Sequence, residues 1–502
     1  MIRPTLRMAL MASPPSDSLQ TVIHQVFQWL QAGQGDQAVA VIEPFIKQYP
    51  GHPQLHYLLG LAFEQTGALP QAIHHVSRAI ALDAGQADMY HALAIMLRKS
   101  GKRAAAMERL KDAIARNPRH ADLHFMMGDL AMDQGNMALA IDCFSMAIDC
   151  NPELLSAWIN LGLCQKGVGA MQRARGCFEQ ALKIDGQSAV SHVNLAHTLL
   201  LQGDYERGFA ELEWRFLLPE GHGLHLPPPP TLPRWNGEPL TDKALLVLAE
   251  QGYGDALQFV RFIPRLLTLG AEVTVCVAKP LEALFQGQPN LGRVQALLDY
   301  QQKFDYFIPM MSLGTMFVRS ADSIVASQRY LLADPERSRY WRHRLPQDRF
   351  KVGLVWEGKA LHQNDPLRRR SANLGEFASL NRLAERITLV SLQKEAAREQ
   401  IFHQDCPVNV LDVGPDLHDF AETAAVVDNL DLVITIDTAV AHLAGGMGKP
   451  VWILLPFAPD WRWTLDRERS PWYPSSRLYR QTRANQWEEP IARLVADLEE
   501  QL

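Results

Sequence analysis

Two consecutive windows of 34 residues decide how the first part of the chain is interpreted: ALPQAIHHVSRAIALDAGQADMYHALAIMLRKSG at 68–101 and KRAAAMERLKDAIARNPRHADLHFMMGDLAMDQG at 102–135. Each window ends on a glycine, and the same step of 34 residues continues on both sides of the pair. Because glycine readily ends a helix, this column predicts a chain break at fixed intervals. Its members are Gly33, Gly67, Gly101, Gly135, Gly169 and Gly203.

Three further columns keep the same register. Small residues recur at two positions of each repeat: Ala38, Ala72, Ala106, Ala140, Ala174 and Gly208, and then Ala79, Ala113, Ala147 and Ala181. Bulky apolar residues hold a third position: Ile42, Val76, Leu110, Phe144, Phe178 and Leu212. We expect the small residues to let helices approach closely, and Pro50, Pro118 and Pro152 to start the next helix, where a missing N–H costs nothing.

This set of columns resembles the tetratricopeptide repeat, whose 34-residue unit is a pair of antiparallel helices. The resemblance implies about six repeats, from roughly Leu19 to Phe216, with a continuous core and a concave groove. Such a groove favours binding of a peptide or protein, and a spacer or dimerisation surface is the alternative. The histidines of this region form no ligand-spaced pair with cysteine or acid, so no metal site is predicted.

Composition excludes several classes of function. The chain has 502 residues, of which 47% are hydrophobic and 21% charged, as in a soluble protein of two to four domains. The net charge of −6 and the lack of a long Lys/Arg run argue against binding to nucleic acid. The six cysteines form no C-x-x-C pair, and the apolar run Met8–Ala12 is too short for a signal sequence. With no transmembrane run either, we expect a cytoplasmic protein with free thiols.

Composition also suggests the domain boundaries. The stretch 217–242 contains PPPP at 227–230 and is expected to be a linker, because it cannot continue a helix. The expected order is a flexible tail at 1–16, the repeats at 17–216, the Pro-rich linker at 217–242, one lobe at 243–345 and a second lobe at 346–502.

From Lys243 onward, short apolar runs alternate with helical stretches, which predicts parallel sheets of the doubly wound kind. Ligands of such sheets bind beyond the carboxyl ends of the strands, so two facing lobes would place those ends around one cleft. The expected strands begin at Ala244, Glu272, Phe304, Val352, Ile387, Asp431 and Val451.

Three segments at expected strand ends carry candidate chemistry. In EQGYGDALQFVRFIP (250–264), Gly252 and Gly254 allow close backbone approach, and Asp255 stands near a helix start. Asp255 is either a general base for an acceptor hydroxyl or an ordinary helix cap. In VGLVWEGKALHQNDPLRRRS (352–371), Lys359 and the arginines at 368–370 either neutralise a diphosphate or lie in a solvated loop.

The third segment is DLVITIDTAVAHLAGGMGKPVWILLP at 431–456, which reads as strand, turn, helix, glycine stop and strand. Asp437 or Thr438 caps the helix, whose first N–H groups suit a phosphate. His442 lies four residues after Thr438 on the same helix face, and it either reaches a phosphate or ribose or forms a structural hydrogen bond.

These segments carry a second resemblance. GYGDALQFVRFIP and DTAVAHLAGGMGKPVW resemble two motifs of the bacterial heptosyltransferases, a glycosyltransferase family 9-like group with the GT-B fold. The whole set, with PRWNGEPL, SLQKE and PDWRW, resembles bacterial tetratricopeptide proteins with a heptosyltransferase-like C-terminal domain. The implied fold class is α + α/β: an all-α tetratricopeptide solenoid followed by a GT-B pair of Rossmann-like parallel-sheet lobes.

The resemblance also implies site residues. Asp255 matches the catalytic base, and residues of the second lobe match the donor side: Asp437, Thr438, His442, Arg370, Gln393, Lys394 and Lys359. Ala439 replaces a family glycine, and Arg370 stands near the position of a phosphate-facing lysine, so the donor need not be ADP-heptose. No D-x-D pair occurs, which favours a metal-free mechanism with no cofactor beyond the nucleotide sugar. For the aromatic segment 460–474, core packing is favoured over a donor wall.

The resulting hypothesis is a glycosyltransferase that moves a sugar from a nucleoside-diphosphate sugar to a hydroxyl of a protein or glycan, with the repeats recruiting the acceptor or a partner. O-linked N-acetylglucosamine transferases combine the same parts, which is an analogy of fold alone. The alternatives are a non-catalytic tetratricopeptide scaffold with a degenerate nucleotide-sugar domain, and a two-lobed epimerase.

Overall fold

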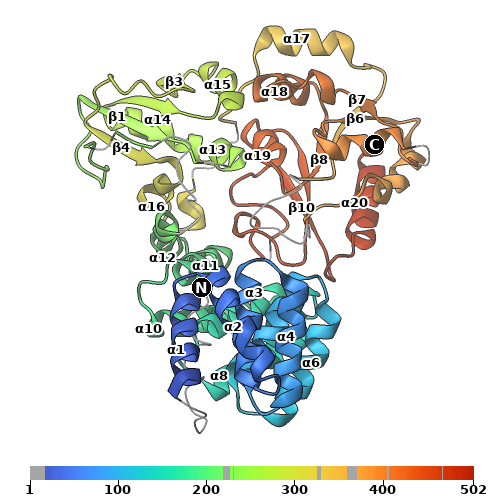
Figure 1. Cartoon of the computed structure of the whole chain (residues 1–502). Helices are drawn as coiled ribbons and strands as arrows, with labels where there is room; N and C mark the ends of the chain where they lie inside the picture. Colours follow the sequence, from blue (N-terminus) through green and yellow to red (C-terminus); the bar gives the residue numbers. More distant parts are fainter. Residues whose placement is uncertain are drawn as a thin grey trace. The chain divides into compact units, whose positions relative to one another are not determined.

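The structure is a computed structural model, and it divides the chain into two compact units (Figure 1). The repeat unit comprises Met1–Gln165 and Lys183–Gly186, and the sheet unit comprises Lys166–Leu182 and Gln187–Leu502. The division therefore falls inside the repeats and not at the Pro-rich stretch. The predicted tail at 1–16 lies outside the described residues, which are 17–218, 227–229, 231–250, 252–324, 329–358, 370–403, 406–465 and 467–502.

The predicted repeats form six successive helix pairs. Each pair consists of two helices joined at a member of the glycine column, and in all pairs but the last the two helices are of similar length. The helices are α1 (Asp17–Gln31), α2 (Gly35–Gln48), α3 (Pro53–Gln65), α4 (Leu69–Leu82), α5 (Ala87–Lys99), α6 (Arg103–Arg116), α7 (Ala121–Asp133), α8 (Met137–Cys150), α9 (Leu155–Gly167), α10 (Met171–Ile184), α11 (Ala189–Leu201) and α12 (Tyr205–Leu212).

The sequence columns take the positions that their chemistry predicts. All six glycines have positive φ, between 73° and 84°, which only glycine adopts without strain. The alanines of the two small-residue columns are fully buried, and so are the bulky residues from Ile42 to Phe178. The helical solenoid predicted from the 34-residue period is thereby confirmed.

The expected role of the prolines is wrong. Pro50, Pro118 and Pro152 lie in the turns between repeats, and the next helices begin three residues later. Their carbonyl groups instead accept hydrogen bonds from one side-chain column of the following helices. The donors are His56 Nε2 at 3.1 Å, His124 Nε2 at 2.9 Å and Trp158 Nε1 at 2.8 Å.

Two separate sheets follow in the sheet unit, and every strand pairing among the described residues is parallel. The four-stranded sheet has the order β3-β2-β1-β4, with β1 (Lys243–Leu248), β2 (Ala271–Cys276), β3 (Arg293–Gln295) and β4 (Tyr306–Pro309). The six-stranded sheet has the order β10-β9-β8-β5-β6-β7, with β5 (Phe350–Val355), β6 (Ile387–Ser391), β7 (Leu411–Asp412), β8 (Leu432–Ile436), β9 (Val451–Leu455) and β10 (Ser476–Arg480).

All seven expected strands are present, and the prediction of parallel sheets is confirmed. The helices between the strands are α13 (Tyr253–Phe259), α14 (Ile263–Thr268), α15 (Lys279–Gln286), α16 (Leu313–Phe317), α17 (Pro335–Arg344), α18 (Phe420–Asp428) and α19 (Ala439–Gly446), and α20 (Glu488–Gln501) ends the chain. Figure 1 shows α13 and α19 lying between the two sheets, and these two helices are in contact.

One hydrophobic core joins the last helices of the repeats to the sheets. Tyr205 and Phe209 of α12 share a cluster of buried residues with strands β1 and β9. Phe209 packs edge-on against Phe259 and Trp461, with ring centroids at 6.0 and 5.6 Å. Trp235, from the stretch expected to be a linker, is also buried in this core. In the part of the chain that the structure describes, no helix is long and apolar enough to cross a membrane.

Candidate functional site

The carboxyl end of β1 leads directly into the first candidate segment. Gly252 precedes α13 with extended backbone, and Asp255 is the third residue of that helix. The alternative interpretation of Asp255 as a helix cap is wrong, because Gly252 is the N-cap and no side chain that the structure describes caps the helix, although the helix dipole favours an acid in the first turn. The Asp255 side chain keeps 27% of its exposure and pairs with Arg462 of η8 (Trp461–Trp463), a short helix that follows β9. The contact brings together residues that are 207 positions apart.

The two glycines of this turn leave room for particular side chains. A Cβ at Gly252 would lie 2.2 Å from Oδ2 of Asp255, and a Cβ at Gly254 would lie 2.7 Å from Cδ2 of His442. The first glycine therefore accommodates the candidate base, and the second lets α13 approach α19.

A buried ion pair holds the start of the same turn. Glu250 accepts hydrogen bonds from Nη2 of Arg215 at 2.5 Å and from the backbone N–H of Met311 at 3.0 Å. Arg215 belongs to η1 (Glu213–Leu217), the short helix that directly follows α12. Burial raises the pKa of Glu250, and Arg215 opposes that effect. The last helix pair of the repeats thus anchors the strand end that carries Asp255.

The carboxyl end of β8 carries the second candidate segment. Thr438 is the N-cap of α19, but its hydroxyl lies 2.9 Å from the hydroxyl of Thr435 and does not cap the helix. His442 is only 4% exposed, its Nδ1 lies 2.8 Å from the hydroxyl of Tyr473, and its ring stacks on Trp463. His442 therefore has the geometry of the structural alternative, and its neutral ring forms part of the contact between α13 and α19.

The cations near Asp437 do not fully compensate the cost of burying its carboxylate. Burial raises its pKa to about 6, with a further contribution from the negative charge of Asp460, while Arg370 and Arg462 act against the rise. His442 shifts the other way: burial lowers its pKa to about 3, and the charge of Arg462 adds to this effect. Two titratable groups of one helix start are thus both driven towards their neutral forms.

The remaining predicted donor residues follow β5 and β6. Gln393 is buried, and its Oε1 accepts from the N–H groups of Trp356 and Glu357 at 3.1 and 3.0 Å. Nζ of Lys394 donates to the carbonyl of Leu417. Gln393 thus fixes the chain at the carboxyl end of β5, where a Cβ on Gly358 would lie 3.3 Å from the Arg370 guanidinium. Lys359, Arg368 and Arg369 lie outside the described residues.

The sequence did not single out Arg462, whose side chain connects three polar residues of the site. It is 9% exposed and donates from Nε to Oε1 of Gln258 at 2.8 Å, from Nη1 to Asp460 at 2.7 Å and from Nη2 to Asp255. The available signal was an arginine between two tryptophans directly after a predicted strand. Those tryptophans, with Trp472 and Tyr473, are buried, as the packing interpretation of the aromatic segment expects.

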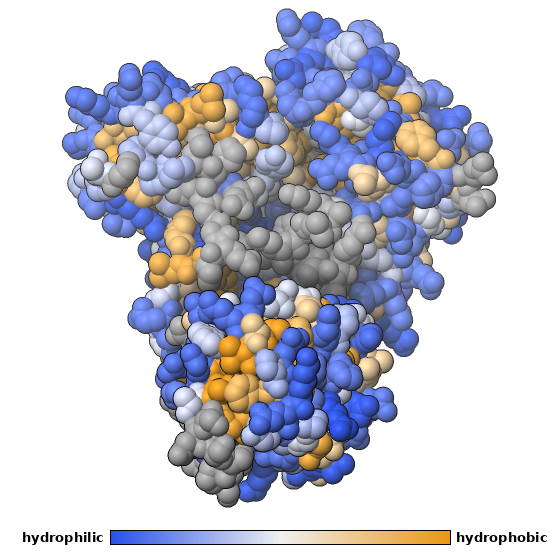
Figure 2. Space-filling model, viewed as in Figure 1, coloured by the Kyte–Doolittle hydropathy of each residue, from blue (hydrophilic) through white to orange (hydrophobic). Residues whose placement is uncertain are grey.

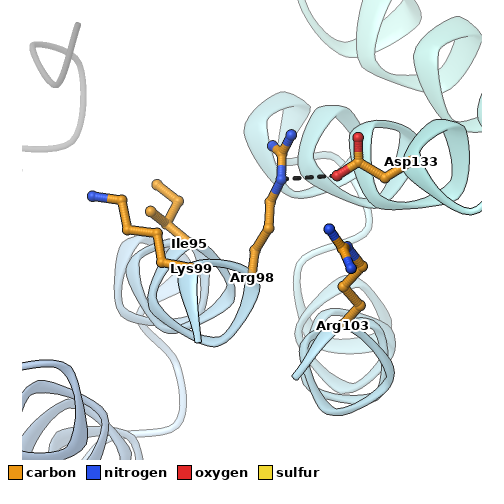
Figure 3. Close-up of a pocket in the computed structure, with 5 residues that line it drawn as sticks. All are labelled: Ile95, Arg98, Lys99, Arg103 and Asp133. Atoms are coloured by element: carbon orange, nitrogen blue, oxygen red, sulfur yellow. Dashed lines mark ion pairs between the residues drawn. The ribbon is translucent and has the colours of Figure 1, made fainter. Parts of the chain in front are cut away.

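The repeat unit has a separate polar cavity of about 440 Å³. It is lined by Ile95, Arg98 and Lys99 from α5, Arg103 from α6 and Asp133 from α7 (Figure 3). Nε of Arg98 pairs with Asp133 at 3.0 Å, whereas Arg103 is exposed and forms no ion pair with any residue that the structure describes. A cation is therefore available at the edge of the cavity.

A hydrophobic patch lies on the same unit. Figure 2 shows it over the α1–α2 hairpin, in surroundings that are otherwise mostly hydrophilic. Partly buried apolar side chains of these helices are Val22, Trp29, Val39, Val41, Phe45 and Ile46, and the C-cap residue Tyr49 adds another. Among the described residues of both units, no group of three or more His, Cys, Asp and Glu side chains could hold a metal ion.

Comparison with known proteins identifies the repeats. Residues 30–87, 91–154 and 155–188 match the tetratricopeptide repeat family, so the N-terminal region contains tetratricopeptide repeats. Protein FlbA of Caulobacter vibrioides is 27% identical over an alignment of 294 residues, and the match covers 53% of this chain and 48% of FlbA. The match thus spans about half the length of that relative.

Two solved structures are similar over part of the chain. The crystal structure of MamA shares 24% identity, covers 33% of this chain and 96% of its own, and has a TM-score of 0.31. The pilF protein of Pseudomonas aeruginosa shares 18% identity, covers 40% of this chain and 92% of its own, and has a TM-score of 0.37.

Proposed function

We propose that the sheet unit is a metal-independent glycosyltransferase that moves a sugar from a nucleoside-diphosphate sugar to a hydroxyl acceptor. One observation carries the proposal. Asp255 and Asp437 follow the carboxyl ends of β1 and β8, strands of two different parallel sheets, and the helices that begin there pack against each other. In doubly wound sheets these strand ends are where ligands bind.

Each acid has a role in this proposal. Asp255 removes the proton of the acceptor hydroxyl as that oxygen bonds to the anomeric carbon of the donor. The bond from this carbon to the diphosphate oxygen breaks, and the diphosphate leaves with the electron pair. The N–H groups that begin α19, together with Arg370, stabilise the leaving diphosphate, because the Thr438 hydroxyl does not occupy them. Lys359 is proposed for the same donor side.

The repeats supply the partner in this proposal. Tetratricopeptide repeats indicate a role in protein interaction, and the cavity between α5, α6 and α7 offers Arg103 to an acidic segment of a protein acceptor or partner. The hydrophobic patch over α1 and α2 offers apolar contacts.

A donor screen tests the proposal. Melting temperature is measured with UDP, GDP, ADP, CDP and dTDP and with their sugars, since a ligand that binds the folded state raises it by mass action. We expect one nucleoside diphosphate to stabilise the sheet unit, and mass spectrometry to detect transfer of its sugar to a protein or glycan. The absence of both stabilisation and transfer across the donors would refute the proposal.

A matched pair of arginine variants locates the donor. Arg370→Gln should weaken nucleotide binding about tenfold or more, since it removes a charge-assisted contact to phosphate. Arg382→Gln is the control, because Arg382 is half-exposed and pairs with Glu499 of α20. Equal losses in both variants would show that the donor lies elsewhere.

A second candidate function is a tetratricopeptide scaffold whose sheet unit binds a nucleotide sugar without transferring it. The ion pair between Asp255 and Arg462 and the buried position of His442 favour this candidate, because both groups already have protein partners. Stabilisation by a nucleotide sugar with no release of nucleoside diphosphate would select it.

A further inference from the structure

The contacts of Arg462 distinguish the two oxygens of Asp255. Oδ1 accepts the hydrogen bond from Nη2 of Arg462. Oδ2 lies over Gly252, close to where that residue would carry a Cβ. One oxygen is therefore held by a buried cation, while the other faces the glycine turn at the carboxyl end of β1.

Arg462 is itself fixed from two sides. Gln258, one turn after Asp255 on α13, accepts from Nε, and Asp460 accepts from Nη1. These contacts use all three nitrogens of the guanidinium, whose planar fork loses little freedom when it is held this way. Arg462 therefore cannot follow the Asp255 side chain, and instead fixes the position of its carboxylate.

Asp460 competes with Asp255 for the same cation. Burial would raise the pKa of Asp460, but Arg462 lowers it to about 2, so Asp460 is charged at neutral pH. Lys166 of α9 and His197 of α11 lie within electrostatic range of Asp460. The last repeats thus place Lys166 and His197 near Asp460, the acid that shares Arg462 with Asp255.

Burial and charge act in opposite directions on Asp255. The balance raises the pKa of Asp255: burial is the largest cause, Asp460 adds to the rise, and Arg462 and Arg215 oppose it. Glu250 carries a further negative charge behind the turn, and the ring of His442 faces Gly254 without charge. The proton affinity of Asp255 therefore depends on how Arg462 divides its contacts between two acids.

We infer that Arg462 is the positioning residue of the site: it holds one oxygen of Asp255, leaves the other for the acceptor hydroxyl, and is balanced by Asp460. This inference rests on the proposed glycosyl transfer for its consequence, but its geometry is independent of the donor. Substituting Arg462 and substituting Asp460 should shift the pKa of Asp255 in opposite directions. A purely structural role of the cluster would not produce opposite shifts.

The test is the dependence of transfer rate on pH in three variants of the full chain. In Arg462→Gln the acidic limb of the pH–rate profile, which reports the pKa of Asp255, should move up by about one pH unit, because Asp255 loses its cation. In Asp460→Asn the limb should move down, because Arg462 is no longer shared. Arg462→Lys keeps the charge without the fork and should lie between Arg462→Gln and the wild type.

The inference would be overturned if the acidic limbs of the pH–rate profiles coincide in all variants, or if they move in the same direction. If Arg462→Gln does not fold, the opposite shift in Asp460→Asn and the intermediate one in Arg462→Lys still decide it. If no transfer is found, the titration of the Asp255 carboxyl carbon is followed by NMR, with Asp255→Asn identifying the signal. Opposite titration shifts without transfer would uphold the positioning role and refute the glycosyltransferase; unchanged titration would refute the positioning role alone.

Discussion

The two strand-to-helix turns of the sheet unit differ in the surroundings of their acidic residues, Asp255 and Asp437. Asp255 lies inside the first turn of α13 and forms an ion pair with Arg462, which it shares with Asp460. Asp437 precedes α19, and its pKa of about 6 shows that burial outweighs the cations around it. Burial raises the pKa of both acids, but Asp255 also accepts a direct hydrogen bond from a buried arginine, which holds its carboxylate in place as a proton acceptor requires. The difference fits a division between a base side and a donor side.

The largest expected effect concerns the buried ion pair between Arg215 and Glu250, which anchors the first turn. Arg215→Met should destabilise the sheet unit by about 3 kcal/mol, because Glu250 would stay buried without its cation. The measurement is denaturant unfolding followed by the fluorescence of the buried tryptophans of the aromatic segment.

The double variant Arg215→Met with Glu250→Leu is the control for this prediction. It should recover much of the lost stability, since removing both charges also removes the cost of desolvating them. A loss below about 0.5 kcal/mol in the single variant would show that the ion pair does not hold the turn.

The next effect separates the two glycines. Gly254→Ala should cost about 1–3 kcal/mol, because its Cβ would meet the buried ring of His442, which has no room to move. Gly252→Ala should cost less, since its Cβ meets the end of the partly exposed Asp255 side chain. Unfolding free energies measured side by side test the order, and a larger loss in Gly252→Ala would contradict the packing of α13 against α19.

The smallest effect concerns Asp437 and depends on pH. Its pKa rises from the ordinary 3.8 to about 6, so its contribution to stability is complete below pH 4 and is lost as the pH rises through 6. Asp437→Asn mimics the protonated acid and should differ least from the wild type at pH 4.5. Above pH 6.5 it should be more stable by on the order of 1 kcal/mol, reduced by partial exposure.

Melting curves of this variant and the wild type between pH 4.5 and 8 measure the difference. A difference that grows towards low pH, or that does not depend on pH, would show that Asp437 is not held near neutrality.

The sequence predicted the parts of the fold that depend on local requirements. The glycine column was visible because each of its members needs a left-handed backbone at the same point of a repeat. The seven expected strands are buried runs that alternate with helices. The other three strands escaped detection: β3 and β7 have only three and two residues, and SRLYR of β10, at a sheet edge, contains two arginines and only two adjacent apolar residues.

The candidate site was only partly predictable, because its charges are balanced over long distances in the chain. Asp255 and Asp437 could be located from strand and glycine patterns. Arg462 meets Asp255 across 207 positions, and Arg215 meets Glu250 across 35. No single sequence reveals which buried arginine neutralises which acid. Similarly, the hydrogen bonds of Gln393 to the β5 end depend on the order of strands in the sheet.

The most direct test of the account is the rate at which purified protein releases nucleoside diphosphate from its sugar donor with acceptor present. Asp305→Asn is the matched control, because this acid lies at the amino end of β4 in the same sheet and accepts from Lys243 and from the N–H of Ala244. We expect a loss of about 100-fold or more in Asp255→Asn and little change in Asp305→Asn. Equal rates in Asp255→Asn and the wild type would show that Asp255 is not the catalytic base.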